Sequence, residues 1–180
     1  MNYENKRSVN SDGVRGLIIT ALMIALIFIG GNLIKIPTQH GMIQFGDCMV
    51  FVAATVLDRK KAFIAGAIGM SLVDISAGYL IWVPFTFIIK GLMAYVASIL
   101  ASKAKSKISY ISAFIAGGIV DLVGYFIANA LMGGVILKVV SGFKASIIYA
   151  ALHFGGDLIP IIVAVVIGVP LAMVVKKIIK

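Results

Sequence analysis

Residues 59–107 read RKKAFIAGAIGMSLVDISAGYLIWVPFTFIIKGLMAYVASILASKAKSK. Two long apolar stretches stand here between two basic clusters, with only a short turn, Gly78 to Val83, separating them. Loops rich in Lys and Arg stay on the cytoplasmic side of a membrane protein, an asymmetry known as the positive-inside bias. The segment therefore predicts two membrane-spanning helices joined by an outer turn. The clusters at its two ends are Arg59-Lys60-Lys61 and Lys103, Lys105 and Lys107.

The same pattern continues on both sides of this segment. Lys6, Arg7 and Arg15 precede the first apolar stretch, and Lys176, Lys177 and Lys180 follow the last, so four clusters hold twelve of the sixteen Lys and Arg residues. Hydrophobic residues form 61% of the chain and charged residues 13%, against about 45–50% and about 25% in soluble proteins. We expect one all-α integral domain over residues 1–180, in the cell membrane, with six crossings and both termini cytoplasmic.

The apolar stretches set the expected helices, because a hydrocarbon core of about 30 Å needs about 20 helical residues. The second stretch is polar in its first half, and its helix could begin as early as Thr38. Gly155-Gly156 and Pro160 could kink the long last stretch, since neighbouring groups can satisfy the freed backbone. The expected helices cover residues 16–34, 46–57, 62–80, 84–102, 108–132 and 145–175.

Ionisable residues inside these stretches are the first candidates for function. Asp74, Lys90, Asp121 and Asp157 fall within predicted crossings, and Asp47 falls near the outer end of another. Such groups are costly in lipid, so they pair with one another, face the bundle interior or line a ligand cavity. Asp74 and Lys90 could form an ion pair across the outer turn, or either could contact a ligand directly.

Two helix faces carry several polar residues each. Asp121, Tyr125 and Asn129 follow one another at intervals of four, which places them on one inward face. His153 and Asp157 have the same spacing on the last helix. A hydrogen-bonded structural histidine and a ligand-binding one are both consistent with this pattern.

The connection between the first two helices is polar and belongs to the same outer end. It runs from Lys35 to Asp47 and contains Pro37, Gln39, His40 and Gln44. Threading the chain needs fewer residues than this, so a lid over an outward-facing cavity is favoured over an ordinary connection.

Known enzyme motifs are missing from the sequence. There is no His-Glu-x-x-His zinc motif, no Walker A sequence and no recognisable nucleophile–base set. Phe154-Gly155-Gly156-Asp157 departs from the Gly-x-Gly-Asp of intramembrane aspartyl proteases at its first position. Cys48 is a single cysteine in an apolar run. We expect no enzyme, no resident metal and no cofactor.

Several short motifs resemble the substrate-binding S components of energy-coupling factor (ECF) vitamin transporters. Their order and spacing carry the resemblance over residues 43–92, and chain length and helix number extend it to the whole sequence. The motifs are Ile43-Gln44-Phe45-Gly46-Asp47, Ala65-Gly66-Ala67-Ile68-Gly69, Leu72-Val73-Asp74-Ile75-Ser76-Ala77-Gly78-Tyr79 and Pro84-Phe85-Thr86-Phe87-Ile88-Ile89-Lys90-Gly91-Leu92.

The resemblance implies a subunit that captures a vitamin or precursor outside the cell and docks on a membrane T component coupled to two cytoplasmic ATPases. The motifs are most similar to the subgroup for hydroxymethylpyrimidine or vitamin B6-type rings. For such a ligand Trp82 or Tyr125 could stack on the ring. The hydrogen-bonding candidates are Gln44, Lys90, Asn129 and His153.

Ala21 and Ala25 in the first helix match the family's Ala-x-x-x-Ala surface for the T component. Small residues four apart allow close helix approach in lipid, which agrees with this role. A stand-alone channel or secondary transporter is the alternative function. Internal repeats would favour it, but residues 14–90 and 91–175 show no convincing similarity.

Overall fold

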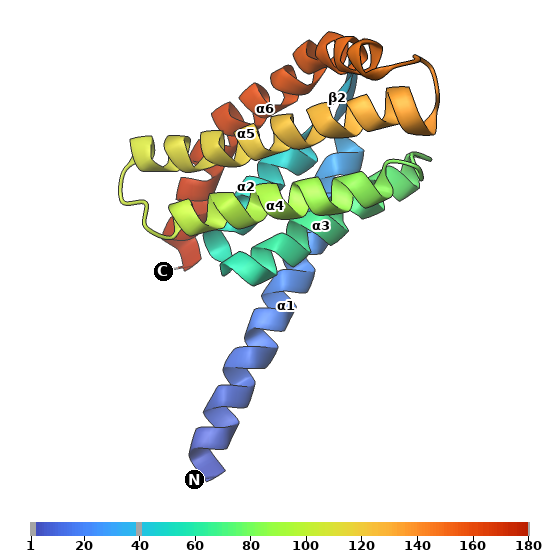
Figure 1. Cartoon of the computed structure of the whole chain (residues 1–180). Helices are drawn as coiled ribbons and strands as arrows, with labels where there is room; N and C mark the ends of the chain where they lie inside the picture. Colours follow the sequence, from blue (N-terminus) through green and yellow to red (C-terminus); the bar gives the residue numbers. More distant parts are fainter. Residues whose placement is uncertain (1–2, 39–40, 180) are drawn as a thin grey trace.

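Six α-helices and one β-hairpin form the described part of the protein (Figure 1). The structure is a computed structural model that describes residues 3–38 and 41–179, with side chains described for residues 13–36 and 43–178. A π-helical turn, η1 (Met132–Ile136), extends the fifth helix. The helices are α1 (Tyr3–Leu33), α2 (Phe45–Val56), α3 (Arg59–Ser76), α4 (Val83–Ala101), α5 (Lys107–Leu131) and α6 (Phe143–Ile179), and the strands are β1 (Lys35–Thr38) and β2 (Gly41–Gln44).

The short helix α2 lies at the centre of the bundle. It contacts α1, α3, α4 and α6, and each of its residues is buried or half-buried. Phe51 of α2 stacks on Phe114 of α5 with ring centroids 4.4 Å apart and planes 6° from parallel. Because α2 is central, its polar residue Asp47 contacts side chains of other helices rather than lipid.

Small residues let α3, α4 and α5 pack closely. A Cβ atom on Gly66 would lie 2.8 Å from the carbonyl oxygen of Lys90, and one on Gly117 would lie 3.0 Å from that of Met93. The distance at Gly66 is shorter than a Cβ atom tolerates, and the one at Gly117 would force the neighbouring backbone to shift, so both positions favour glycine. Close approach of this kind is typical of helices associating in lipid.

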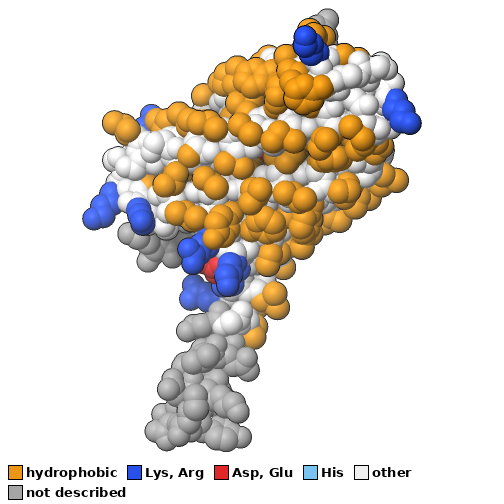
Figure 2. Space-filling model, in the orientation of Figure 1, with side chains coloured by type: hydrophobic (Ala, Val, Ile, Leu, Met, Phe, Trp, Pro, Cys, Tyr) orange, Lys and Arg blue, Asp and Glu red, His pale blue; other side chains and the backbone are white. Residues whose placement is uncertain are grey.

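Apolar side chains cover much of the outer surface. Figure 2 shows them across the broad face of the bundle, with Lys and Arg side chains at its margins. A soluble monomer rarely exposes apolar patches of such extent, so this surface is suited to lipid. On α3 and α5 the exposed residues recur three or four apart: Ile64, Ile68, Leu72 and Ile75, and Ile115, Ile119, Val123 and Ile127.

The connection after α1 is a hairpin, which corrects the expectation that the second helix could begin at Thr38. β1 and β2 pair antiparallel with Lys35 opposite Gln44, and α2 begins only at Phe45. Pro37 lacks a backbone N–H and disfavours helix. Pairing between the strands gives their backbone groups hydrogen-bond partners.

Four of the six helices are long and apolar enough to cross a membrane. The other two differ in kind: α2 has 12 residues, or about 18 Å of helix, and α3 contains Arg59, Lys60, Lys61 and Asp74. The prediction of six helices is confirmed, while six crossings remain a prediction. The four segments that meet this criterion are Gly13–Leu33, Val83–Ala101, Lys107–Ile136 and Phe143–Ile178.

The observed helix ends differ from the expected ones where polar residues control them. α1 begins at Tyr3 rather than near residue 16, because the helix continues through the polar N-terminal segment. α3 begins at Arg59 because Asp58 caps it, accepting hydrogen bonds from the backbone N–H groups of Lys60 and Lys61. The same helix ends at Ser76, before Gly78 turns the chain with φ of 82°.

Candidate functional site

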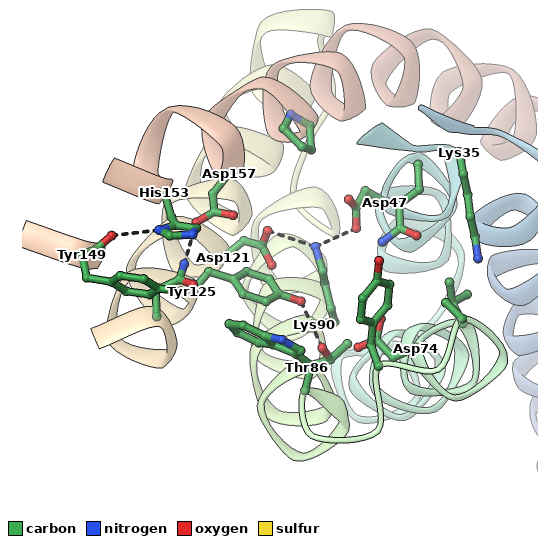
Figure 3. Close-up of a pocket in the computed structure, with 17 residues that line it drawn as sticks. Lys35, Asp47, Asp74, Thr86, Lys90, Asp121, Tyr125, Tyr149, His153 and Asp157 are labelled. Atoms are coloured by element: carbon green, nitrogen blue, oxygen red, sulfur yellow. Dashed lines mark hydrogen bonds and ion pairs between the residues drawn. The ribbon is translucent and has the colours of Figure 1, made fainter. Parts of the chain in front are cut away.

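A cavity of about 380 Å³ lies among the hairpin and helices α2 to α6 (Figure 3). Its volume is in the usual range for small-molecule sites, about 300–1,000 Å³. Every helix except α1 contributes to its walls. The lining residues are Lys35, Gln44, Asp47, Val73, Asp74, Ala77, Tyr79, Trp82, Thr86, Lys90, Asp121, Tyr125, Asn129, Tyr149, His153, Asp157 and Pro160.

An ion-pair network joins three helices at this cavity. The Nζ atom of Lys90 on α4 lies 2.7 Å from Oδ1 of Asp47 on α2 and 3.0 Å from Oδ2 of Asp121 on α5. All three side chains are at most 5% exposed. A buried ammonium is stable only with such compensation, so the network fixes α2, α4 and α5 relative to one another.

The network corrects the ion-pair hypothesis for Asp74. Lys90 forms ion pairs with Asp47 and Asp121, whereas the structure of the described residues shows none between Lys90 and Asp74. The reason is the direction of the lysine side chain, which extends between α2 and α5. Asp74 still lines the cavity, near the end of α3.

An aromatic wall stands beside the ion pairs. The rings of Trp82 and Tyr125 are 6.3 Å apart and inclined by 44°, and the Tyr125 hydroxyl lies 3.2 Å from Thr86 Oγ1. Lys90 Nζ lies 5.2 Å from the centroid of the Tyr125 ring, in cation–π range. A flat ring entering the cavity would find an apolar face here and charged groups next to it.

A second group of polar side chains lies on the α5–α6 side of the cavity. Asn129 Nδ2 donates to Asp157 Oδ2 at 3.1 Å. His153 Nδ1 lies 2.8 Å from the carbonyl oxygen of Tyr149, one turn earlier in α6. Because a carbonyl only accepts, this contact assigns the N–H to Nδ1.

The root of the hairpin is tied to the ends of two helices. Lys35 Nζ and Ser76 Oγ both donate to Asn32 Oδ1, each at 2.8 Å. Lys35 and the opposing Gln44 line the cavity. The hairpin is therefore anchored between α1 and α3 at one boundary of the site.

The cavity brings together all six residues predicted to bind a ligand. Binding by them remains a prediction. Four aspartates predicted as structural or paired residues line the same cavity. Of the predicted lid residues, Pro37 lies in β1, whereas Gln39 and His40 lie outside the described residues. The six are Gln44, Trp82, Lys90, Tyr125, Asn129 and His153, and the four are Asp47, Asp74, Asp121 and Asp157.

Sequence reasoning missed several lining residues, among them Thr86, Tyr149 and Lys35. Helical spacing could have found two of them, because Thr86 precedes Lys90 by four residues and Tyr149 precedes His153 by four. The position of Lys35 in the cavity wall depends on the hairpin, and we recognised no turn pattern for that hairpin in the sequence. Ala21 and Ala25, the predicted partner contacts, are exposed on α1 and away from the cavity lining.

An apolar outer surface around a polar cavity defines this as a multi-pass membrane protein with an internal site for a small molecule. The model of the family described as ECF-type riboflavin transporter, S component, matches residues 12–177. The chain belongs to this family, which consists of substrate-binding subunits of transporters. The resemblance noted in the sequence is thereby confirmed.

Two relatives are similar to the chain over most of their length. One, from Pyrococcus woesei, is described as an uncharacterized protein in gap 3'region; it is 28% identical over 145 residues, covering 80% of this chain and 88% of the relative. The other is the thiamine precursor transporter HmpT of Lactococcus lactis subsp. cremoris (strain MG1363), 26% identical over 129 residues, covering 70% of this chain and 74% of that protein.

Proposed function

We propose that this protein is the capture subunit of an ECF-type importer for a small heteroaromatic vitamin or precursor of the hydroxymethylpyrimidine or pyridoxine type. The observation that carries the proposal is the cavity, in which an aromatic wall stands beside buried hydrogen-bonding groups. A compact ring with amino or hydroxyl substituents can stack on Trp82 or Tyr125 and bond to the polar residues around it.

Uptake itself requires other proteins. The ligand enters the cavity from outside, and the loaded subunit docks on a T component that two cytoplasmic ATPases drive. The exposed Ala21 and Ala25 on α1 support a docking surface there, because small side chains let a partner helix approach closely. Six crossings with cytoplasmic termini complete the proposed arrangement, which the basic clusters support.

The experiment is ligand identification on the purified full-length chain. Native mass spectrometry of the gently purified protein should reveal a retained small molecule, since nanomolar affinity corresponds to about 12 kcal/mol and slow release. Calorimetry with hydroxymethylpyrimidine, pyridoxine, riboflavin and pantothenate then ranks the candidates. Preference for riboflavin or pantothenate would replace the proposed ligand, and absence of binding by every compound would overturn the function.

Variants can connect the ligand to the cavity. Trp82→Ala and Asn129→Ala should each weaken binding about tenfold or more, because each removes a stacking or hydrogen-bonding group. Phe143→Ala is the matched control, an aromatic residue that is 80% exposed and lies outside the lining. Unchanged affinity in both cavity variants would show that the ligand binds outside this cavity.

The alternative, a stand-alone channel or secondary transporter, differs in what it needs. An S component transports uphill only with its T component and ATPases. Co-purification from the native membrane followed by reconstitution tests this difference. ATP-independent accumulation of the vitamin by the isolated chain would favour the alternative.

A further inference from the structure

One oxygen atom of Asp121 has a partner in the protein and the other has none among the described residues. Oδ2 accepts a hydrogen bond from Lys90 Nζ at 3.0 Å, whereas the buried Oδ1 has no hydrogen-bond donor within the part of the chain that the structure describes. Asp121 is 3% exposed and lines the cavity. Buried carboxylate oxygens are normally hydrogen-bonded, so the missing donor is expected to belong to whatever fills the cavity.

Lys90 presents the complementary group beside this oxygen. Its ammonium has three N–H donors, and two carboxylates, those of Asp47 and Asp121, lie within ion-pair distance of it. The same Nζ atom also lies 5.2 Å from the centroid of the Tyr125 ring, which lines the cavity. Figure 3 shows Asp121 between Lys90 and Asp157, with its carboxylate directed toward the lysine. A donor and a free acceptor therefore stand next to each other at one edge of the cavity.

We propose that Lys90 and Asp121 together recognise the amidine edge, –N=C–NH₂, of an aminopyrimidine ring. The exocyclic amine donates to Asp121 Oδ1, and the neighbouring ring nitrogen accepts from Lys90 Nζ. Trp82 and Tyr125 lie beside the pair and cover the face of the ring. The inference rests on the proposed function, because it requires the vitamin or precursor to occupy this cavity.

The pair then acts as a specificity determinant within the proposed ligand class. Replacing the exocyclic amine with a carbonyl reverses the edge, so that oxygen faces the carboxylate and ring N–H faces the ammonium. Pyridoxine has no exocyclic amine to offer Asp121. A site whose buried groups are left unpaired or opposed discriminates strongly against the wrong ligand.

The test compares two pyrimidines of the same shape on the full-length protein. Calorimetry should find hydroxymethylpyrimidine bound at least about tenfold more tightly than its oxo analogue, in which a carbonyl replaces the amine. Asp121→Asn should lose most of this preference. Asp58→Asn is the matched control, because it makes the same chemical change at an exposed residue before α3, and it should keep the wild-type ratio.

The possible outcomes distinguish a failure of this inference from a failure of the proposed function. Equal affinity for the two pyrimidines, or an unchanged ratio in Asp121→Asn, overturns the amidine-edge assignment and leaves vitamin capture in place. Binding of none of the vitamins overturns both. Thermal unfolding of each variant checks that it is folded, and if Asp121→Asn is not, the ratio for the wild-type protein decides alone.

Discussion

Lys90 lies where α2, α4 and α5 meet, and its ammonium is shared by two carboxylates. Each of the three charges is buried, so none can be removed without leaving the others poorly compensated. Removing one partner of a buried pair usually costs about 3–5 kcal/mol, whereas replacing the whole set with uncharged groups is often neutral. The network therefore makes stability depend on the three residues as a unit.

Lys90→Met should destabilise the protein by about 3 kcal/mol, because it leaves Asp47 and Asp121 without their cation. The triple variant Lys90→Met/Asp47→Asn/Asp121→Asn should lie closer to the wild type. Thermal unfolding in a fixed detergent measures both. A triple variant less stable than the single one would show that the charges do not act as a unit.

Residue types and helical spacing found many of the polar residues of the cavity, but not their pairing. Asp121, Tyr125 and Asn129 share one helix face, and all three line the cavity. The short turn between α3 and α4 suggests Asp74 as one possible partner of Lys90. Its true partners come from α2 and α5, whose proximity arises only from the packing of the whole bundle.

The start of α3 shows how a single side chain fixes the end of a helix. Asp58 accepts backbone hydrogen bonds from Lys60 and Lys61, each at 3.1 Å, and its carboxylate lies 2.8 Å from Lys61 Nζ. These interactions lie outside the apolar part of the helix. They explain why α3 includes its basic cluster although hydropathy alone placed its start three residues later.

Asp58→Ala should lower stability by about 1 kcal/mol, because it removes the cap, while Asp58→Asn keeps a capping oxygen and should lose less.

The hydrogen bond from Lys61 lowers the pKa of Asp58 below 3.8. A lowered pKa stabilises the fold above 3.8, and the contribution is lost as the pH falls through the lowered value. Thermal unfolding of Asp58→Ala and wild type should differ at neutral pH and converge in strong acid. An equal difference at every pH would contradict the assignment.

Helix α1 has a surface suited to a partner helix. Ala21 and Ala25 are exposed, while Met23 and Ile27 are buried against the bundle. Ala21→Trp and Ala25→Trp should abolish ATP-driven uptake by the assembled transporter and leave ligand affinity of the isolated subunit nearly unchanged. Leu22→Trp is the control, since Leu22 is exposed on the same helix but is already large. Loss of ligand binding in the alanine variants would mean that this face supports the bundle instead.

Helices were easier to predict than the hairpin for a physical reason. Long apolar runs must become helical in lipid, because only then are their backbone groups satisfied within the segment. The segment 35–44 is short and polar. The structure of its strands β1 and β2 depends on their pairing with each other and on the hydrogen bond from Lys35 to Asn32. No periodic pattern in the sequence reports such contacts.

The positions of the basic clusters predict the orientation of the whole molecule in the membrane. The basic clusters at residues 59–61 and 103–107 flank the two ends of the α3–α4 pair, and the turn that joins these helices carries no Lys or Arg. The positive-inside bias predicts that both clusters and both termini face the cytoplasm. The same orientation directs the cavity toward the outside, as the proposed function requires.

Cysteine labelling in intact cells tests this orientation. Cys48 is the single cysteine and is buried, so Cys48→Ala provides a background without thiols. Lys60→Cys and Lys105→Cys should react only after the membrane is permeabilised, whereas Lys138→Cys, in the connection between η1 and α6, should react from outside. Labelling of residue 60 or 105 by an impermeant reagent in intact cells would reverse the topology.

The sharing of Lys90 between distant parts of the chain also has a consequence for biosynthesis. The ribosome delivers Asp47 well before Lys90, and Lys90 well before Asp121, so a nascent α2 has no counter-ion when it reaches the translocon. The insertion machinery must shelter that carboxylate until α4 arrives. Nascent chains truncated after α3 should therefore be degraded faster than chains truncated after α4, and Asp47→Asn should remove the difference in a pulse-chase experiment.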